Sequence, residues 1–407
     1  MSTVPPSPTS KFPFRSLRVA VVTETWPPEI NGVAHTLGKL VEGLRRIGHR
    51  VELVRPRQEQ SDKSTPDDSE EILVRGLPIP MYPSLRIGLP APGQLLRHWQ
   101  RRMPDIVHIA TEGPLGLAAL NAADTLHIPV TSSFHSNFDS YSKHYGMGWV
   151  QGSLTRYLRY FHNRSQLTLV PTQALAGQLT ATGYRNVEVL ARGIDTDLFN
   201  PARRSHALRV TWGARPETPV VMYVGRVAPE KNIEQVISAF SAIRHQHPGA
   251  KLVIVGDGPS RSALQKIYPQ PIFTGMRTGT DLATHYASGD LFLFPSMTET
   301  YGNVTLEALA SGLPVIAYDL AAAAELIQPG INGHVVPAGD SRAFTSACCT
   351  LAGQRIKLMQ MREHARQSVE AHRWEAIQER LSSKLHQAVR IHDRKHNVES
   401  GLLIVPD

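Results

Sequence analysis

The sequence predicts an α/β protein with two Rossmann-like domains, each built on a doubly wound parallel sheet, that face each other across a cleft. In both halves of the chain, short apolar runs of strand length alternate with amphipathic stretches of helical period, as expected for parallel strands covered by helices. The length of 407 residues suits two domains of roughly 200 residues each. A hydrophobic content of 41% with 19% charged residues is enough for two cores.

The predicted domain boundaries follow this pattern along the chain. Residues 1–16 lack a hydrophobic signal segment and are expected to form a disordered tail. Residues 17–200 make the first domain, and residues 201–372 make the second. Residues 373–392 form a final amphipathic helix, after which the chain is expected to fray; its apolar positions are Trp374, Ile377, Leu381, Leu385 and Val389.

Charge and cysteine content narrow the class of protein. The formal net charge of +8 favours anionic partners, and because basic residues are spread along the chain, nucleic acid is not expected among them. Cys348 and Cys349 are adjacent and cannot form a disulfide framework or a zinc site with each other, so they are predicted to pack on a helix in a reducing compartment. No apolar run reaches the roughly 18 residues of a membrane-spanning helix. These features predict a cytoplasmic protein, soluble or peripheral on a membrane.

In the first domain, buried strands are predicted over residues 18–23, 51–54, 105–109, 129–134 and 167–172. Residues 56–72 are polar and are expected to form a surface loop. Residues 76–93 are rich in proline and glycine, with apolar and basic residues among them, which is typical of a loop packed on the core.

Two features of the first domain lie where strands end, the edge at which open α/β sheets bind ligands. Asn31-Gly32 follows the first strand, and a glycine there lets the backbone approach a ligand. The G-x-G-x-x-G pattern of a dehydrogenase is absent from this loop. His135 ends a later strand and is well placed for chemistry, although a chain with 18 histidines also places one there by chance.

The triplet Asp195-Thr196-Asp197 has the D-x-D pattern with which some enzymes bind a metal ion. Such a site normally follows a strand inside a nucleotide-binding sheet. Here the triplet precedes Phe199-Asn200-Pro201 and a charged linker, which favours a connecting segment over a metal site.

In the second domain, strands are predicted over residues 220–224, 251–255, 272–275, 291–294, 312–317 and 335–336, with a loop at residues 321–327. Arg226 and Lys231 lie in G-R-V-A-P-E-K-N, between the first of these strands and a helix. Cations are unfavourable at a helix start, where the dipole is positive, so anion binding explains them better than helix stability does.

The stretch T-E-T-Y-G-N-V-T-L-E-A-L-A-S-G, residues 298–312, follows the apolar strand at 291–294. Gly302-Asn303 supplies turn and cap chemistry, which places Glu299 in the loop and Glu307 on the next helix. Each ionised carboxylate can accept the hydrogen bonds of a sugar diol. A loop charge followed by an ordinary helix-face glutamate is the alternative.

Taken with its surroundings, this E-x7-E stretch resembles the retaining, nucleotide-sugar-dependent glycosyltransferases of the GT-B fold, the large family 4 group. The following L-P-V-I-A, the G-R-V-A-P-E-K-N loop, the G-D-G-P turn and the N-G-V turn match as well, so the resemblance covers nearly the whole chain. Within the group, the chain is most similar to GDP-mannose-dependent α-mannosyltransferases that act on lipid acceptors. Sulfoquinovosyl-diacylglycerol synthases come next.

The resemblance implies roles for individual residues. Arg226 and Lys231 would bind the two phosphates of the donor and stabilise the leaving diphosphate, so that no metal is required. Glu299 would hold the hydroxyls of the hexose, and Glu307 those of the ribose. His135, Arg226, Lys231 and Glu299 are the implied catalytic residues. The other implied donor contacts are Gly32, Gly256, Asp257, Gly258, Met276, Tyr301, Gly302, Asn303 and Val304.

For the acceptor, the resemblance points to the first domain. His135, in F-H-S-N, would lie beside the transferred sugar, and Tyr141, Lys143 and Tyr145 would contact the acceptor. In relatives that use lipid acceptors, the part matching residues 76–93 faces the membrane. Residues 321–327 depart from the glycine-rich form usual in the family, and the final helix would cross back to the first domain.

The expected activity is transfer of a hexose, preferably mannose from GDP-mannose, to a lipid or glycolipid acceptor with an α-linkage. No metal cofactor is expected. Peripheral contact with an anionic membrane is expected. Transfer from UDP-glucose is the nearest alternative. A nucleotide-sugar epimerase of this architecture and a catalytically silent binding protein are the others, and the full set of Arg226, Lys231, Glu299 and Glu307 argues against the last.

Overall fold

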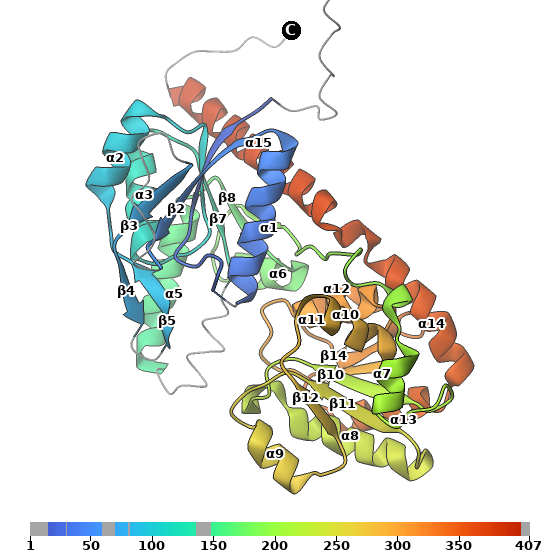
Figure 1. The fold of residues 1–407 in the computed structure, drawn as a ribbon. Helices are drawn as coiled ribbons and strands as arrows, with labels where there is room; N and C mark the ends of the chain where they lie inside the picture. Colours follow the sequence, from blue (N-terminus) through green and yellow to red (C-terminus); the bar gives the residue numbers. More distant parts are fainter. Residues whose placement is uncertain (1–14, 30, 59–69, 80–81, 136–147, 400–407) are drawn as a thin grey trace, which may run out of the picture.

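The fold was examined in a computed structural model, which describes residues 15–29, 31–58, 70–79, 82–135 and 148–399. It contains two parallel sheets, each covered by helices and each in its own half of the chain (Figure 1). This confirms the predicted α/β class with two doubly wound domains. Among the described residues, no helix combines the length and apolar character needed to cross a bilayer.

The first sheet has the strand order β3-β2-β1-β6-β7-β8-β9, and all of its pairs are parallel. Its strands are β1 Arg18–Val22, β2 Arg50–Pro56, β3 Glu71–Val74, β6 Ile106–Ile109, β7 Val130–Ser133, β8 Leu167–Val170 and β9 Val187–Val189. Its helices are α1 Gly32–Ile47, α2 Pro92–Arg101, α3 Pro114–Thr125, α5 Gly148–Asn163 and α6 Gln173–Ala181. Central strands such as β6 are buried along their full length because helices cover both faces.

Residues 76–79 and 82–88 differ from the predicted loop. They form an antiparallel hairpin of β4 Gly76–Ile79 and β5 Tyr82–Gly88, with Leu77 opposite Ile87. A two-stranded ribbon has a free edge on each side, so the prolines, which cannot donate a ladder hydrogen bond, are tolerated in it. Their presence is what made the segment resemble a loop.

The second sheet has the order β12-β11-β10-β13-β14-β15 and is also parallel. Its strands are β10 Val220–Val224, β11 Lys251–Val255, β12 Ile272–Gly275, β13 Leu291–Phe294, β14 Val315–Tyr318 and β15 Gly333–Val336. Its helices are α7 His206–Thr211, α8 Ile233–Gln246, α9 Arg261–Ile267, α10 Gly279–Ser288, α11 Asn303–Ala310, α12 Ala321–Leu326, α13 Ser341–Ala352 and α14 Arg355–Ser368.

The helix α12 corrects the prediction of a loop at residues 321–327. This segment begins with a run of alanine, the strongest helix former, and contains no glycine that would favour a turn. The same composition that departs from the family's glycine-rich form therefore produces a short helix.

The last helix, α15 Trp374–Glu399, runs from the second domain back along the first (Figure 1). Its residues Ile377, Leu381 and Leu385 share a buried cluster with Leu40 and Leu44 of α1. The helix continues past residue 392, where fraying was predicted. Basic residues in its last turns explain this extension, because cations are favourable at the negative end of a helix dipole.

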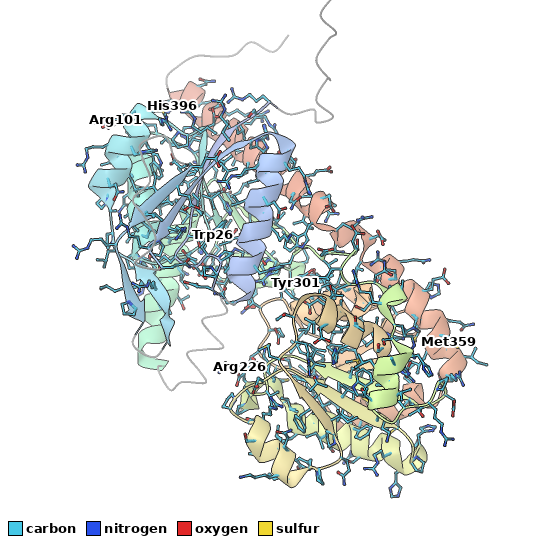
Figure 2. The ribbon with its side chains drawn as sticks, viewed as in Figure 1. Trp26, Arg101, Arg226, Tyr301, Met359 and His396 are labelled. Carbon is cyan, nitrogen blue, oxygen red and sulfur yellow. The ribbon has the colours of Figure 1, made fainter. Side chains whose placement is uncertain are left out.

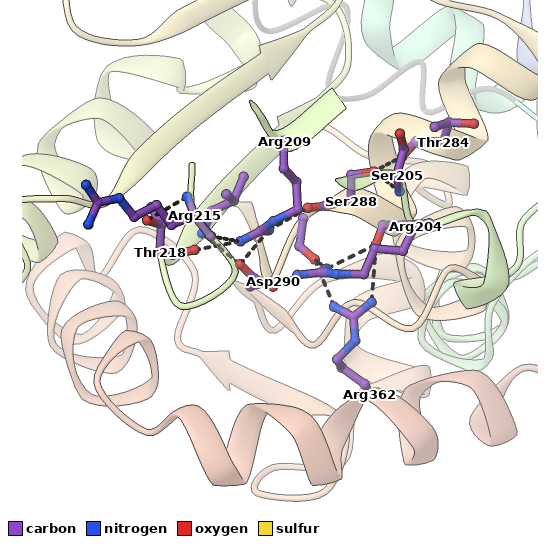
Figure 3. A network of polar contacts seen from close by, with 12 residues as sticks. Arg204, Ser205, Arg209, Arg215, Thr218, Thr284, Ser288, Asp290 and Arg362 are labelled. Atoms are coloured by element: carbon purple, nitrogen blue, oxygen red, sulfur yellow. Dashed lines mark hydrogen bonds and ion pairs between the residues drawn. The ribbon is translucent and has the colours of Figure 1, made fainter. Parts of the chain in front are cut away.

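Ion pairs and hydrogen bonds connect several elements of the second domain at the amino ends of its strands (Figure 3). The Asp290 carboxylate, directly before β13, pairs with Arg204 at 2.6 Å and with the buried Arg209 at 3.0 Å, and it accepts the backbone N–H of Val220 at 2.9 Å. Arg362 of α14 donates to the carbonyl of Gly289 at 2.8 Å. The linker, α14 and β13 are thus held at one point.

Candidate active site

The chain order of the second sheet reverses between the neighbouring strands β10 and β13. In open α/β sheets, ligands bind outside the carboxyl ends of the strands at such a switch point. The loops that follow these two strands contact each other there. The Thr298 hydroxyl donates to the Glu230 carbonyl at 3.4 Å, and the Asn232 amide donates to the Pro295 carbonyl at 3.4 Å.

The two loops bring Lys231 and Glu299 together. The Lys231 ammonium donates to Glu299 Oε1 at 2.5 Å, and the Ser296 hydroxyl donates to the same oxygen at 2.8 Å. Both side chains of the pair are less than one-fifth exposed. Arg226 is more open: its side chain is 55% exposed and pairs with Glu230 at 3.3 Å. Lys231, which was predicted to bind phosphate, and Glu299, which was predicted to bind the hexose, are therefore in direct contact.

The predicted donor glycines Gly256 and Gly258 pack backbone against backbone. A Cβ on Gly256 would lie 1.9 Å from the carbonyl oxygen of Gly225, and one on Gly258 would lie 2.3 Å from that of Val227. Their φ angles of 137° and 158° also favour glycine. The carboxylate of Asp257 accepts from the Gly258 N–H at 2.7 Å and from Arg261 at 2.8 Å. This turn therefore supports the loop that carries Arg226.

The helix α11 starts at the same edge. Gly302, with φ of 91°, turns the chain into the helix, so the N–H groups of Asn303 and Val304 form its start, where the dipole favours an anion. Glu307 accepts the hydroxyl of Tyr286 at 2.8 Å, and burial raises the pKa of its carboxyl to about 7. Met276 follows β12 at this edge and is 63% exposed.

The first domain reaches this region through the start of α1. Asn31 caps the helix by accepting the N–H groups of Val33 and Ala34 at 3.1 and 2.8 Å. A Cβ on Gly32 would lie 3.6 Å from the side-chain nitrogen of Asn303, which belongs to the second domain. Figure 2 shows Trp26, in the loop after β1, and Tyr301 on facing edges of the two domains.

The chain order of the first sheet reverses between β1 and β6, and Glu24 lies at that switch point. Its carboxylate accepts the N–H of Leu115, in the first turn of α3, at 2.9 Å. Burial raises the pKa of Glu24 to about 7. Sequence reasoning did not select this residue, whose observed contact is that of a helix cap.

His135 follows β7, and neither of its ring nitrogens has a hydrogen-bond partner among the described residues. Burial lowers the pKa of His135 well below its usual value, and the nearby Arg192 lowers it further, so the ring is neutral at pH 7. Arg192 and His135 line the same small cavity of about 10 Å³.

Arg192 is a residue that sequence reasoning missed. The residue is 8% exposed, and its guanidinium donates to Asn303 Oδ1 at 3.4 Å and lies 5.8 Å from the centre of the Tyr301 ring. The available signal was a charged residue three positions after β9, in V-L-A-R-G-I-D, but that strand was not predicted from the sequence. Asp195, in the same segment, accepts the N–H groups of Asp197 and Leu198 at 3.1 and 2.8 Å and so closes a turn.

Two parts of the surface lie apart from this arrangement. The predicted acceptor residues Tyr141, Lys143 and Tyr145 fall outside the described residues. A hollow of about 650 Å³ lies against α14, away from the switch point, and its lining includes Ile331, Ile356 and Lys357 but no carboxylate. It contributes nothing to the predicted donor site.

Comparison with known proteins identifies the family of the chain. Residues 218–354 match the family model described as glycosyl transferases group 1, and residues 30–198 match that of glycosyltransferase family 4. A GDP-mannose-dependent alpha-mannosyltransferase of Mycobacterium tuberculosis is 35% identical over 329 residues, covering 80% of this chain and 85% of the relative. The chain belongs to glycosyltransferase family 4. The protein is therefore an enzyme of the hexosyltransferase class.

Two further proteins place this glycosyltransferase among its relatives. A GDP-mannose-dependent alpha-(1-6)-phosphatidylinositol monomannoside mannosyltransferase of M. tuberculosis is 29% identical over 396 residues, covering 90% of this chain and 98% of the relative. The sucrose-phosphate synthase structure from Thermosynechococcus elongatus superimposes with a TM-score of 0.71 at 18% identity, covering 92% of this chain and all of that one. The second match shows the fold alone, which is GT-B.

Proposed function

We propose that this glycosyltransferase is a retaining enzyme that transfers mannose from GDP-mannose to a lipid or glycolipid acceptor with an α-linkage. The observation that carries the proposal is the contact of Lys231 with Glu299 at the switch point, beside the start of α11. This arrangement offers a cation and free N–H groups to a diphosphate and a carboxylate to the attached hexose. The relatives named for GDP-mannose and for a phosphatidylinositol glycolipid support the donor and the acceptor class.

In the proposed reaction, donor and acceptor meet on one face of the hexose. The bond from the anomeric carbon to the phosphate oxygen breaks, the bond to the acceptor oxygen forms, and the departing phosphate takes the acceptor proton. Arg226 and Lys231 carry the growing negative charge in place of a metal ion, Glu299 holds hexose hydroxyls, and Glu307 holds the ribose. His135, neutral and at the end of β7, faces the hexose from the first domain.

A panel of nucleotides tests this proposal against its alternatives. A ligand that binds the folded state raises the melting temperature by mass action, so GDP is expected to raise it more than UDP, ADP or CDP. A sugar nucleotide with the base of the best-shifting nucleotide is then incubated with a lipid extract, and the transferred sugar is traced. A larger shift with UDP would favour the UDP-glucose reaction, conversion of the donor without any acceptor would favour an epimerase, and binding without turnover would favour a silent binding protein.

The nucleotide affinity is expected to depend on pH through Glu307. Its pKa of about 7 means that acidification below pH 7 protonates the carboxyl, which then loses acceptor capacity for the ribose hydroxyls. Affinity for GDP measured by calorimetry should therefore fall by up to about tenfold per pH unit between pH 7 and pH 5.5. Glu307→Gln should bind GDP about tenfold to a hundredfold more weakly at pH 8.

In Glu307→Gln, the pH dependence of GDP affinity that remains comes from titration of the GDP phosphate itself. Only the difference between the pH dependence of the wild type and that of the variant belongs to Glu307. Glu299→Gln serves as the matched control, because it should lower turnover while keeping GDP affinity near that of the wild type. Equal loss of GDP affinity in both variants would show that the assignment of ribose and hexose to the two glutamates is wrong.

We also propose that the enzyme docks transiently on anionic lipid. The net charge of +8 and the hairpin β4–β5, on which Leu77 is 52% exposed, support this contact. Co-sedimentation with vesicles that contain anionic lipid is expected, and it should weaken as salt is added. Binding to neutral vesicles of equal strength, or no binding to either kind, would contradict the proposal.

A further inference from the structure

The segment that joins the two domains brings Arg192 to the point where two helices from opposite domains begin. A Cβ on Gly32, the first residue of α1, would lie 3.4 Å from Arg192 Nη1. The same guanidinium nitrogen donates to the side chain of Asn303, the first residue of α11, at 3.4 Å. Three sources of positive potential, one guanidinium and two helix starts, therefore converge on one spot.

This concentration of positive charge is poorly compensated by the protein itself. Arg192 is 8% exposed, and its Nε has no hydrogen-bond partner among the described residues. Among the described residues, Arg192 forms no ion pair, and Glu299, in the loop that precedes Asn303, is already held by Lys231 at 2.5 Å. A buried guanidinium without an ionic partner is costly, and a cation beside a helix start is unfavourable. An anion bound at this spot would remove both costs.

We propose that Arg192 contacts the β-phosphate of the donor, as a third cation that reaches the diphosphate from the segment joining the domains. This inference rests on the proposed function, which supplies the nucleoside diphosphate. The β-phosphate is favoured because it carries the hexose, the hexose is assigned to Glu299, and Glu299 lies in the loop that leads to Asn303, which accepts the Arg192 hydrogen bond. The planar guanidinium can present two N–H groups to the phosphate oxygens.

The contact would also join the two domains through the ligand. Gly32 belongs to the first domain, Asn303 to the second, and Arg192 to the connection between them. A phosphate held by the guanidinium and by the start of α11, and lying against Gly32, would therefore contact the two domains at once. Arg226 and Lys231, both on the second domain, cannot supply that link by themselves.

Calorimetry with GDP, UDP and GMP on the full-length protein tests the proposal. Arg192→Gln is expected to weaken binding of the preferred nucleoside diphosphate about tenfold to a hundredfold and to leave GMP within about twofold. Arg192→Lys should recover part of the diphosphate affinity, because the charge remains and the fork is lost. Arg373→Gln is the matched control: Arg373 directly precedes α15 and bridges to Ile194 of the connection, and its side chain is 45% exposed and pairs with Glu370, so its loss should not change either affinity.

The outcomes separate the two levels of inference. If the wild type binds no nucleotide, the proposed function itself fails. If the wild type binds GDP or UDP and Arg192→Gln binds it equally well, Arg192 has no phosphate role. An equal loss for diphosphate and monophosphate would instead assign Arg192 to positioning Asn303 and Tyr301. Should Arg192→Gln not fold, the ratio of diphosphate to monophosphate affinity in Arg192→Lys decides, and an unchanged ratio overturns the proposal.

Discussion

Replacing Lys231 by glutamine is expected to lower kcat by about 10²- to 10³-fold, the usual cost of removing one preorganised group that stabilises developing charge. Negative charge grows on the diphosphate as the hexose leaves, and Lys231 lies at the loop where that charge is predicted to develop. The substitution also removes the 2.5 Å partner of Glu299, so the hexose contact should weaken with it. The loss is therefore expected to appear in kcat more than in KM.

Steady-state kinetics beside a thermal melt checks this prediction. Lys266→Gln is the matched control, because Lys266 is an exposed lysine on α9 and its replacement should leave kcat unchanged. A Lys231→Gln enzyme that retains kcat within about threefold of the wild type, far from the cost of a lost charge contact, would remove Lys231 from the mechanism.

The assignment of Arg226 and Lys231 to the diphosphate, in place of a metal ion, also predicts full activity in EDTA. Activity that EDTA abolishes and Mn²⁺ restores would instead favour a metal site at Asp195-Thr196-Asp197.

Replacing Asp290 by alanine is expected to destabilise the protein by about 3–5 kcal/mol, the cost of removing one partner from a buried ion pair. Arg209, which is 2% exposed, would lose its ion-pair partner, Arg204 would lose a contact at 2.6 Å, and the Val220 N–H would lose its acceptor (Figure 3). The three contacts share the Asp290 carboxylate, so a single substitution removes all of them at once.

Urea unfolding followed by far-ultraviolet circular dichroism measures this effect. Glu363→Ala is the matched control in the same domain: Glu363 of α14 is exposed and accepts a hydrogen bond from Gln367 at 3.5 Å, so its loss should cost no more than about 0.5 kcal/mol. If the two variants lose the same free energy of unfolding, the Asp290 network does not hold the second domain together.

The sequence predicted the central strands well because a parallel strand covered on both faces is a continuous apolar run, as in β10 and β13. It missed β3 and β9, which lie at the edges of the first sheet. It also predicted that Glu299 lies in a loop and Glu307 on a helix, since the turn at Gly302-Asn303 is local chemistry. It misjudged the hairpin β4–β5 and the helix α12. Proline in one and an atypical alanine run in the other made composition a poor guide to hydrogen bonding.

Arg192 shows why the rest was not predictable from the sequence. Its surroundings include Gly32, Tyr301 and Asn303, which lie far from it along the chain and meet only when both domains are folded. In the sequence, Arg192 is one arginine among 43 basic residues. Its significance comes from burial and from two helix starts, neither of which is local.

The course of α15 has a consequence for synthesis of the chain. The core of the first domain includes Ile377, Leu381 and Leu385, which are translated after the strands of both sheets. While the chain emerges from the ribosome, the apolar face of α1 therefore stays exposed to water, although the first domain is translated first. The second sheet needs no residue from α15 in its buried cluster and can fold earlier. The domain that begins the chain is thus the last to be completed, and a premature stop before Trp374 would leave that surface open to aggregation.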